Sequence, residues 1–240
     1  MFLTVLERKL IMELCDASGG TVDVVWDGIT RAETLHEEAA CIRHDLADAA
    51  KAFDWPRVLE LLSVQGDLIN CTRPGGSSLF APLHQAAYGG ATVEVVKRLI
   101  SIGAWRTLQN SRGERPLDVA ERQHHEHLFG VLAPSYKHCV PLGVLLKIQA
   151  HFHDIIRERA EQLVQEQRLR LPELEPLLEL DRPQMWFPVP GMYGGFSFRL
   201  ESTGIEAKLV SESWCRVVGG SGQRHEITPN GSQLVEEGFV

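Results

Sequence analysis

Residues 81–87 read APLHQAA, and residues 116–120 repeat the pattern as PLDVA, 34 positions later. Each copy has a proline near its start, which fits the first turn of a helix because a backbone N–H would have no partner there. The small alanines that follow let neighbouring helices approach closely. Gly89, Gly90 and Gly103 supply residues that tolerate a positive φ where helices end. The repeated pattern predicts pairs of helices that stack along the chain.

A weaker copy precedes these two. Ala49 and Ala50 lie 37 positions before Ala86 and Ala87, and the longer interval reflects residues 72–78, which read TRPGGSS. Three copies are about the minimum for a stable stack, and terminal copies depart from the common pattern. We therefore expect about three helix pairs, of which the first is the least regular.

The repeated residues resemble those of ankyrin repeat proteins, in particular bacterial proteins in which a C-terminal tail follows the repeats. Residues 82–87 are similar to the family's T-P-L-H-x-A-A, with Ala81 in place of the threonine. Residues 110–113 (NSRG) are similar to the tip of the family's finger-like turn. The family's histidine, here His84, implies hydrogen bonds between turns. The resemblance covers about residues 43–134 and implies a helical stack that binds proteins through finger tips and first-helix faces.

Both flanks of the repeats are expected to cover the open ends of the stack. Residues 1–14 place apolar side chains at helical spacing, which predicts a helix. Thr30 and Glu33 form a capping-box pattern, which predicts the start of another helix. Residues 144–167 predict a long amphipathic helix with residues 157–159 on its solvated face.

The chain changes character after residue 182. Prolines and glycines cluster between residues 183 and 195, which predicts irregular chain. Residues 196–200, 205–218 and 224–228 carry strand patterns with glycines between them, which predicts a small antiparallel sheet. A sheet of this size is not stable alone, so we expect it to pack on the helix of residues 144–167.

These patterns predict a mainly α fold, α+β over the whole chain. Its expected centre is an ankyrin-type helical stack of about three repeats, with N-terminal helices before it and a C-terminal helix plus a small antiparallel sheet after it. The expected segments are an N-terminal helical flank (1–42), ankyrin repeats (43–135), a helical connector (136–182) and a β tail packed on the connector (183–240).

The charge balance argues against nucleic acid and membranes as partners. The 240 residues include 24 Lys and Arg and 32 Asp and Glu, which gives a formal net charge of −8 at pH 7. Proteins that bind nucleic acid or anionic membranes usually carry a basic face. The acidic balance instead suits a partner protein with a basic face.

The cysteine and hydropathy patterns predict a cytoplasmic protein. The five cysteines are widely spaced and include no CxxC motif, so neither a disulfide framework nor a thiolate zinc site is expected. No stretch approaches the roughly 20 apolar residues that cross a bilayer. Glu7, Arg8 and Lys9 interrupt the apolar residues at the start of the chain, unlike the core of a signal peptide.

No combination of residues predicts catalysis, a metal or a cofactor. Residues 124–127 (HHEH) are rich in metal-ligand types, but adjacent helical residues point in different directions, so surface histidines are favoured. His151 and Asp154 share a helical face, yet two ligands do not make a zinc site. Cys215 lies in an expected strand, where a buried structural thiol is favoured over a nucleophile. The sequence therefore favours a non-enzymatic protein.

The leading hypothesis is an interaction scaffold that binds a partner protein through the ankyrin fingers and the concave surface. Trp105 and Arg106 stand where the family usually has Asp and Val, and Trp and Arg are frequent interface anchors. For Trp105, packing against residues 73–79 or against a flank is an equal alternative. An immunity or antitoxin-like inhibitor is one specific form of this hypothesis, by analogy alone. The predicted contact residues are Arg73, Gln85, Tyr88, Trp105, Arg106, Gln109, Arg112 and Glu114.

The alternative hypothesis places an enzyme or a small-ligand site in residues 183–240, with the repeats as a recruiting module. It requires a pocket between the sheet and the helix of residues 144–167. A third hypothesis gives the tail no role except to cap the stack. The predicted ligand residues of the tail are Tyr193, Arg216, Arg224 and His225.

Overall fold

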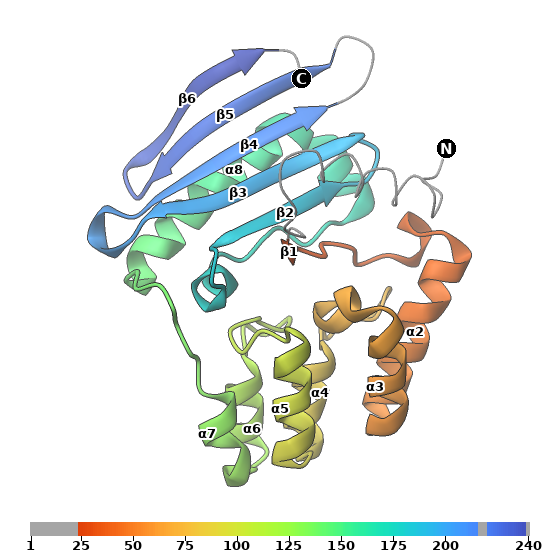
Figure 1. Cartoon of the computed structure of the whole chain (residues 1–240). Helices are drawn as coiled ribbons and strands as arrows, with labels where there is room; N and C mark the ends of the chain where they lie inside the picture. Colours follow the sequence, from red (N-terminus) through yellow and green to blue (C-terminus); the bar gives the residue numbers. More distant parts are fainter. Residues whose placement is uncertain (1–23, 216–219, 239–240) are drawn as a thin grey trace.

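The computed structural model describes residues 24–215 and 220–238, which form a helical half and a sheet half (Figure 1). The strand β1 (Val24–Val25) belongs to the sheet half. From β1 the chain passes into the helical half and then returns to the sheet half. The expected helix of residues 1–14 and the predicted ligand residue Arg216 lie outside the described residues.

The helical half contains three consecutive helix pairs that lie side by side (Figure 1). Short turns join the two members of each pair. Longer loops, residues 71–81 and 103–115, join one pair to the next and point toward the sheet half. The pairs are α2 (Glu37–Lys51) with α3 (Trp55–Val64), α4 (Pro82–Gly89) with α5 (Val93–Ile102), and α6 (Pro116–Arg122) with α7 (Phe129–Leu132).

Local sequence explains where most of these helices begin and end. Helices α4 and α6 begin at Pro82 and Pro116, where the absence of an N–H leaves no bond unmade. The Thr92 hydroxyl accepts the backbone N–H of Val95 and so caps α5. Gly90, with a φ of 62°, ends α4, because a left-handed backbone favours glycine.

The sheet half is a six-stranded sheet with one face covered by α8 (Leu142–Gln167) (Figure 1). Strand β1 runs parallel to β2, with Val24 opposite Met185, and all other neighbours in the sheet are antiparallel. Phe152 of α8 packs with Phe196 and Phe198 in the core between helix and sheet. The strands after β1, in spatial order, are β2 (Gln184–Val189), β3 (Gly194–Ser202), β4 (Lys208–Cys215), β5 (Ser221–Thr228) and β6 (Gly231–Gly238).

The expected fold class, a mainly α repeat stack with a small tail, is wrong. Within the described residues, seven α-helices combine with a six-stranded mixed sheet in an α+β fold. Residues 24–25, which precede all the helix pairs, supply the parallel edge strand of that sheet. Residues 184–189, expected to be irregular because of their prolines, form β2. The β-branched residues 21–26 suit either a short strand or a docked loop. Only the pairing of Val24 and Val25 with the distant strand β2 decides between these alternatives.

The start of α2 also differs from the capping-box prediction. The Thr30 hydroxyl donates to the backbone carbonyl of Arg168 at 2.6 Å and does not cap a helix. Arg31 donates to the carbonyl of Glu166 at 2.9 Å. These bonds tie the chain to the C-terminal end of α8, and α2 begins only at Glu37.

Aromatic stacking joins the two halves. Trp26, which follows β1, stacks on Trp105 with ring centroids 5.7 Å apart and the ring planes at 4°. The Trp26 indole N–H donates to the carbonyl of Arg170 at 3.0 Å, and the Arg170 guanidinium lies 5.2 Å from the Trp26 ring centroid. Trp105 and Leu108 belong to the same buried cluster as α8 and the sheet. The loop of residues 103–115 is therefore part of the sheet-half core.

Candidate functional site

The loop of residues 103–115, which the resemblance identifies as a partner-binding finger, contacts residues 169–180 of the same chain. Glu179 accepts the backbone N–H of Thr107 at 2.9 Å and its hydroxyl at 2.6 Å, through the same carboxylate oxygen. Glu179 also accepts the N–H of Arg106 at 3.2 Å. Glu173 accepts the N–H of Gln109 at 3.0 Å. Two carboxylates thus satisfy the backbone donors that a free finger would offer to a partner.

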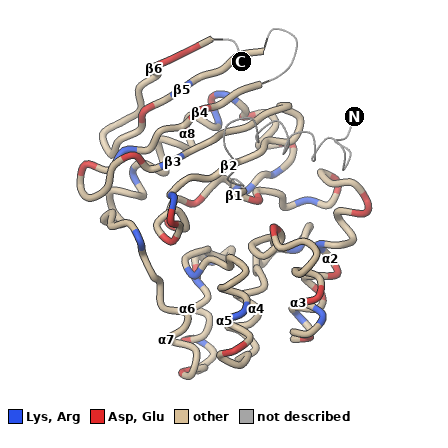
Figure 2. The backbone as a smooth tube through the Cα atoms, in the orientation of Figure 1, with Lys and Arg blue, Asp and Glu red and all other residues tan. Residues whose placement is uncertain are grey.

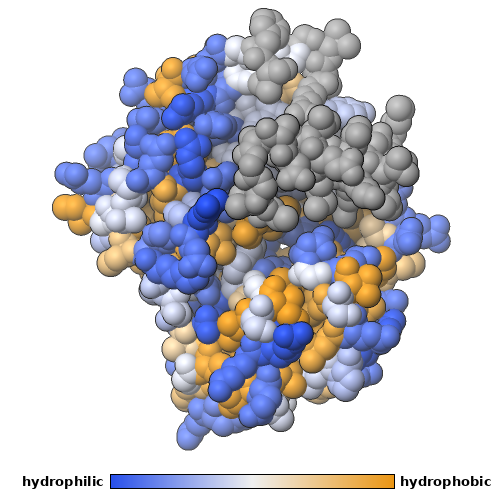
Figure 3. Space-filling model, viewed as in Figure 1, coloured by the Kyte–Doolittle hydropathy of each residue, from blue (hydrophilic) through white to orange (hydrophobic). Residues whose placement is uncertain are grey.

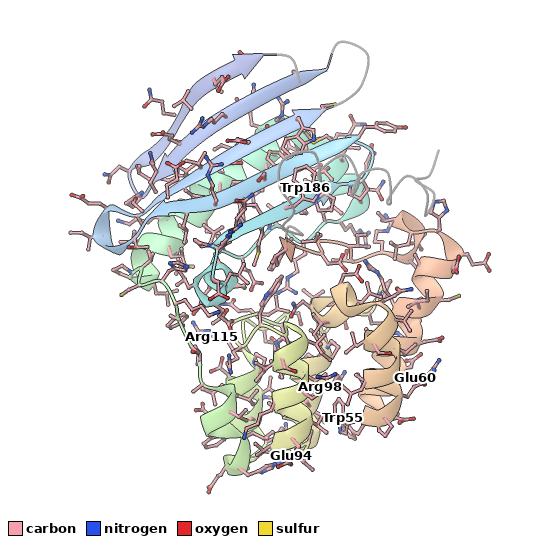
Figure 4. All side chains as sticks on the ribbon, in the orientation of Figure 1. Trp55, Glu60, Glu94, Arg98, Arg115 and Trp186 are labelled. Carbon is pink, nitrogen blue, oxygen red and sulfur yellow. The ribbon has the colours of Figure 1, made fainter. Side chains whose placement is uncertain are left out.

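An ion pair between half-buried Arg115 and buried Glu175 reinforces this contact. Arg115, labelled at the junction of the two halves in Figure 4, donates to both carboxylate oxygens of Glu175 at 2.6 and 2.7 Å. Glu175 is 5% exposed and also accepts the Tyr136 hydroxyl at 2.6 Å. Burial, together with the hydrogen bond to that carboxylate, raises the pKa of Tyr136 to about 12. One Arg115 nitrogen, Nη2, donates to both oxygens, and the Arg115 side chain is 25% exposed whereas that of Glu175 is 7% exposed. The buried carboxylate therefore depends more on the arginine than the arginine depends on it.

Trp105 is covered by the chain itself, so its alternative as an exposed contact is wrong, whereas Arg106 and Gln109 are half-buried and bonded within the chain. Trp105 is 5% exposed and stacks on Trp26, which is the flank packing that the sequence left open. The Arg106 guanidinium donates to the carbonyl of Val131 at 3.0 Å. Gln109 is bonded through its N–H to Glu173 and through its carbonyl to Arg170.

Glu114 and Arg112 lie at the tip of the same loop. The Glu114 carboxylate accepts Asn110 Nδ2 at 2.8 Å and Arg122 Nε at 2.9 Å, and these bonds hold the pKa of Glu114 below its usual range. The side chain of Arg112 is 64% exposed. Glu114 therefore has a structural role, whereas Arg112 is available to a partner.

The remaining predicted contact residues lie around a groove in the helical half. A cavity of about 250 Å³ lies between α2, the loop of residues 71–80 and α4, and we call it the α2–α4 groove. Arg73 and Gln85, both predicted from sequence, line it. Tyr88 lies one helical turn after Gln85 and is 45% exposed, with its ring 6.2 Å from that of Phe80. The groove is lined by Leu46, Ala47, Ala50, Lys51, Cys71, Arg73, Gly76, Ser77, Ser78, Phe80, Pro82 and Gln85.

The α2–α4 groove combines a buried apolar floor with a polar rim. Leu46, Ala50 and Cys71 are buried, whereas Lys51 and Arg73 are exposed. Arg73 forms an ion pair with Asp48 of α2. Burial raises the pKa of Cys71 to about 12, so its sulfur remains a protonated thiol and is not a nucleophile.

Backbone hydrogen bonds hold the loop of residues 71–80 in place. Gly75 N–H donates to the carbonyl of Thr30 at 2.7 Å, and Ser111 N–H donates to the carbonyl of Ser78 at 3.0 Å. The His44 ring is 3.1 Å from the carbonyl of Pro74. The groove wall is thus fixed from three directions before any partner arrives, which lowers the entropy lost on binding.

The histidine-rich residues 124–127 connect helix pairs. His125 Nε2 lies 3.1 Å from the carbonyl of Tyr88, and His127 Nε2 lies 3.1 Å from that of Ala91. Among the described residues, no group of three or more His, Cys, Asp or Glu side chains could hold a metal ion. Among the helices of residues 24–215, none is both long enough and apolar enough to cross a membrane.

The predicted ligand residues of the tail do not converge. Tyr193 is 51% exposed in the turn between β2 and β3. Arg224 lies near Glu201 and Glu212 on the sheet face opposite α8. His225 faces α8 and lines a second cavity, to which α8 contributes Arg159. Arg159 could not be identified as a cleft residue from the sequence, because helical periodicity places it among solvated charges.

Acidic and basic residues are interspersed over both halves rather than gathered on one face (Figure 2). On the face seen in Figure 3, hydrophobic residues gather over the helices, while the strands carry mostly hydrophilic ones. Val64 of α3 is 80% exposed on the helical half. On that one face, the two halves therefore differ in hydropathy and not in charge.

No family model and no curated protein matches the sequence. One solved structure that it matches is that of a predatory endopeptidase from Bdellovibrio bacteriovorus in complex with an immunity protein. The match has 22% sequence identity and a TM-score of 0.33 and covers 50% of this chain and 65% of the other. The chain thus spans less than two thirds of the length of the protein it matches. A TM-score this low does not establish a shared fold.

Proposed function

We propose that this protein is a protein-binding module whose α2–α4 groove holds a segment of its partner. The observation that carries the proposal is the preformed groove with a buried apolar floor and two of the predicted contact residues, Arg73 and Gln85, on its walls. The resemblance of residues 43–134 to ankyrin repeats favours the same reading, because such stacks bind proteins through first-helix faces. The backbone of residues 106–109 has no part in it, because Glu173 and Glu179 accept N–H groups of that segment. Arg112 is exposed at the loop tip but does not line the groove.

The size of the groove favours a protein segment over a cofactor. Small-molecule sites usually enclose about 300–1,000 Å³ and most of the ligand surface. The groove offers about 250 Å³ and is bordered by exposed Lys51 and Arg73. This suits one or two inserted side chains with further contacts around them, as at the centre of a protein interface.

Charge defines the partner segment. The exposed cations Lys51 and Arg73 border the groove, so we propose that the segment places an apolar side chain on the floor and carboxylate or carbonyl oxygens near these two residues. The net charge of −8 would still attract a partner with a basic face over longer distances. An immunity or antitoxin-like inhibitor is the specific form of this proposal in which the partner is an enzyme. Identification of a captured partner would test this form.

The experiment compares capture of partners from host lysate by three forms of the full chain. The groove variant is Lys51→Ala/Arg73→Ala, which removes the two exposed cations that line the groove. The matched control is Glu94→Ala/Arg98→Ala on α5 (Figure 4), which also removes two exposed side chains from the helical half. We expect wild type and control to retain the same stoichiometric partner, and the groove variant to bind it at least about tenfold more weakly.

Two outcomes would count against the proposal. Equal retention by the groove variant would show that the partner binds elsewhere, and the absence of any stoichiometric partner would remove the basis for a binding module. If a partner is retained and is an enzyme, its activity is measured with and without the wild-type chain. Unchanged activity at saturating protein would exclude the inhibitor form.

A further inference from the structure

A second cavity, of about 550 Å³, opens between α8 and the strands β5 and β6. We call it the α8–β5 cleft. It lies in the sheet half, whereas the α2–α4 groove lies in the helical half. Its lining is mostly polar and consists of Ile155, Glu158, Arg159, Gln223, His225, Ser232 and Leu234.

Two buried hydroxyl groups lie under the sheet beside the cleft, although Ser211 and Ser213 are not among the residues that line it. Leu209, Ser211 and Ser213 alternate along β4, and Leu209 packs in the core beneath α8, so both serines face α8 as well. Ser211 pairs with the cleft residue His225, and Ser213 pairs with Gln223. The serines are 1% and 2% exposed, and neither hydroxyl has a hydrogen-bond partner within the described residues. Buried polar atoms without partners are rare enough to require an explanation.

Arg159 presents a cation to the same cleft. Its Nη2 donates to the carbonyl of Ser221 at 2.6 Å and to the Ser221 hydroxyl at 3.0 Å. Its Nε is buried and has no hydrogen-bond partner in residues 24–215 or 220–238. No ion pair joins Arg159 to a carboxylate in this part of the chain, although most arginines around it have one. Partial burial of a guanidinium is unfavourable unless an anion or several acceptors compensate for the lost water.

We infer that the α8–β5 cleft binds a small organic carboxylate, with Arg159 as its principal donor and Ser211, Ser213 and His225 beside it. Three of the four buried polar atoms without a partner in the described residues belong to this group of side chains. All of these groups can donate a hydrogen bond, and a guanidinium binds a carboxylate with two parallel bonds.

The surrounding charges favour a singly charged carboxylate over a phosphate. Glu158 lines the cleft, and Glu237 is held nearby by a 2.8 Å bond from Gln223. Both carboxylates repel an incoming anion, and the repulsion rises with the charge of the ligand. A ligand whose remaining part is neutral or cationic is therefore preferred.

The test is thermal unfolding of the full chain titrated with acetate, benzoate and phosphate, with acetamide as an uncharged analogue and chloride added to equal ionic strength. We expect a monocarboxylate to raise the Tm of the wild type in a saturable manner. Arg159→Met should weaken this binding by about tenfold or more. Arg157→Met is the matched control, because Arg157 lies on the same helix and its side chain is 50% exposed.

Each alternative outcome overturns the inference. Absence of saturable stabilisation by any monocarboxylate, or equal binding by the wild type and Arg159→Met, would exclude the site. Stronger binding of phosphate would exclude the carboxylate assignment, and equal binding of acetamide would exclude recognition of charge. These results are independent of the α2–α4 groove, because none of the altered residues lines it.

Two further measurements apply if Arg159→Met folds poorly. Ser211→Ala/Ser213→Ala removes hydroxyls that make no hydrogen bond, so it should weaken carboxylate binding without lowering the Tm of the free protein. Imidazole NMR provides a second signal, because burial holds the pKa of His225 below its usual range while Glu158, Arg159 and Glu237 act on it. A bound carboxylate should raise that pKa. Unchanged binding in the serine variant together with an unchanged His225 pKa would overturn the inference.

Discussion

Single buried polar residues determine much of the geometry of the helical half. His84 is fully buried at the start of α4. Its Nδ1 accepts the N–H of Ala81 at 3.3 Å, and its Nε2 lies 3.3 Å from the carbonyl of Glu114. A neutral ring with its proton on Nε2 satisfies both contacts. The hydrogen bonds between turns that the resemblance implied at this position are present. They join His84 to backbone groups of the helical half alone, so predicting them requires no information about the sheet half.

We predict that stability falls as pH drops from about 6.5 to about 4, and that His84→Gln removes part of this fall. Burial lowers the pKa of His84 to about 4, so in this window the unfolded chain takes up a proton that the folded chain does not. The stabilisation that neutral His84 provides is complete above the pKa of this residue in the unfolded chain. It decreases as the pH falls toward the pKa of His84 in the folded chain, by about 3 kcal/mol in total.

Urea unfolding of the wild type and His84→Gln at both ends of this pH window measures the effect. His124→Asn is the control, because His124 is exposed and its left-handed backbone tolerates asparagine. If the free energy of unfolding falls by the same amount across this pH window in the wild type, His84→Gln and His124→Asn, groups other than His84 cause the pH dependence.

Trp105 shows where inference from a single residue left two alternatives open. Its replacement of the family's usual residue suggested an exposed anchor, but the Trp26 ring occupies that position. We predict that Trp105→Ala lowers the free energy of unfolding by about 3–5 kcal/mol, as expected for a buried aromatic side chain. Tyr88→Ala, which removes an exposed ring, should change it by about 0.5 kcal/mol. Similar values for the two variants, measured by urea unfolding, would mean that Trp105 is exposed in solution.

At the scale of elements, the sequence predicted those with local signals and missed those that depend on distant partners. The prolines at residues 82 and 116 marked the starts of α4 and α6, and an apolar stripe marked most of α8. Strand β2 was missed because Pro188 weakens a strand pattern, yet it pairs with Gly195 of β3. The contact between the loop of residues 103–115 and residues 169–180 has no pattern in the sequence, because it depends on three glutamates that resemble surface charges.

The element contact with the clearest test is the Arg115–Glu175 pair. We predict that Arg115→Met lowers the free energy of unfolding by about 3–5 kcal/mol, because it leaves the buried Glu175 carboxylate without its cation. Adding Glu175→Gln to Arg115→Met should recover part of this loss. The coupling energy from the double-mutant cycle then measures the contact.

The Lys137–Asp181 pair is the control for this cycle. It has a similar distance, 2.7 Å, but both side chains are largely exposed. Exposed pairs contribute little because water screens them. Equal coupling energies in the two cycles would show that the Arg115–Glu175 pair is as exposed to water in solution as the Lys137–Asp181 pair.

At the scale of the whole molecule, the two halves share one buried region. Trp26 stacks on Trp105 of the loop of residues 103–115 and donates to the backbone carbonyl of Arg170. The two halves therefore cannot separate from each other without exposing the surfaces of these aromatic rings. Glu173 and Glu179 would lose their backbone donors at the same time. This relation between the halves could not be predicted from the sequence, because the residues involved lie far apart in the chain and belong to segments with different periodicities.

The shared region predicts a single cooperative unfolding transition. Far-UV circular dichroism reports mostly the helices. Tryptophan fluorescence reports the Trp26–Trp105 stack at the junction, the Trp186–Trp214 stack on the sheet and Trp55 of α3; Trp55 and Trp186 are labelled in Figure 4. We expect both signals to change at the same urea concentration, because loss of the sheet removes the partner of β1 and opens the core around Trp26.

Arg170→Ala tests the coupling directly. It removes the cation over Trp26 and the bonds to Gln109 and Glu173 without altering either half elsewhere. We expect the midpoint to fall and the two signals to separate, with fluorescence changing first, because the junction then opens before the helices melt. Two separate transitions in the wild type would mean that the halves unfold independently. A single unshifted transition in Arg170→Ala would mean that the junction adds little to their stability.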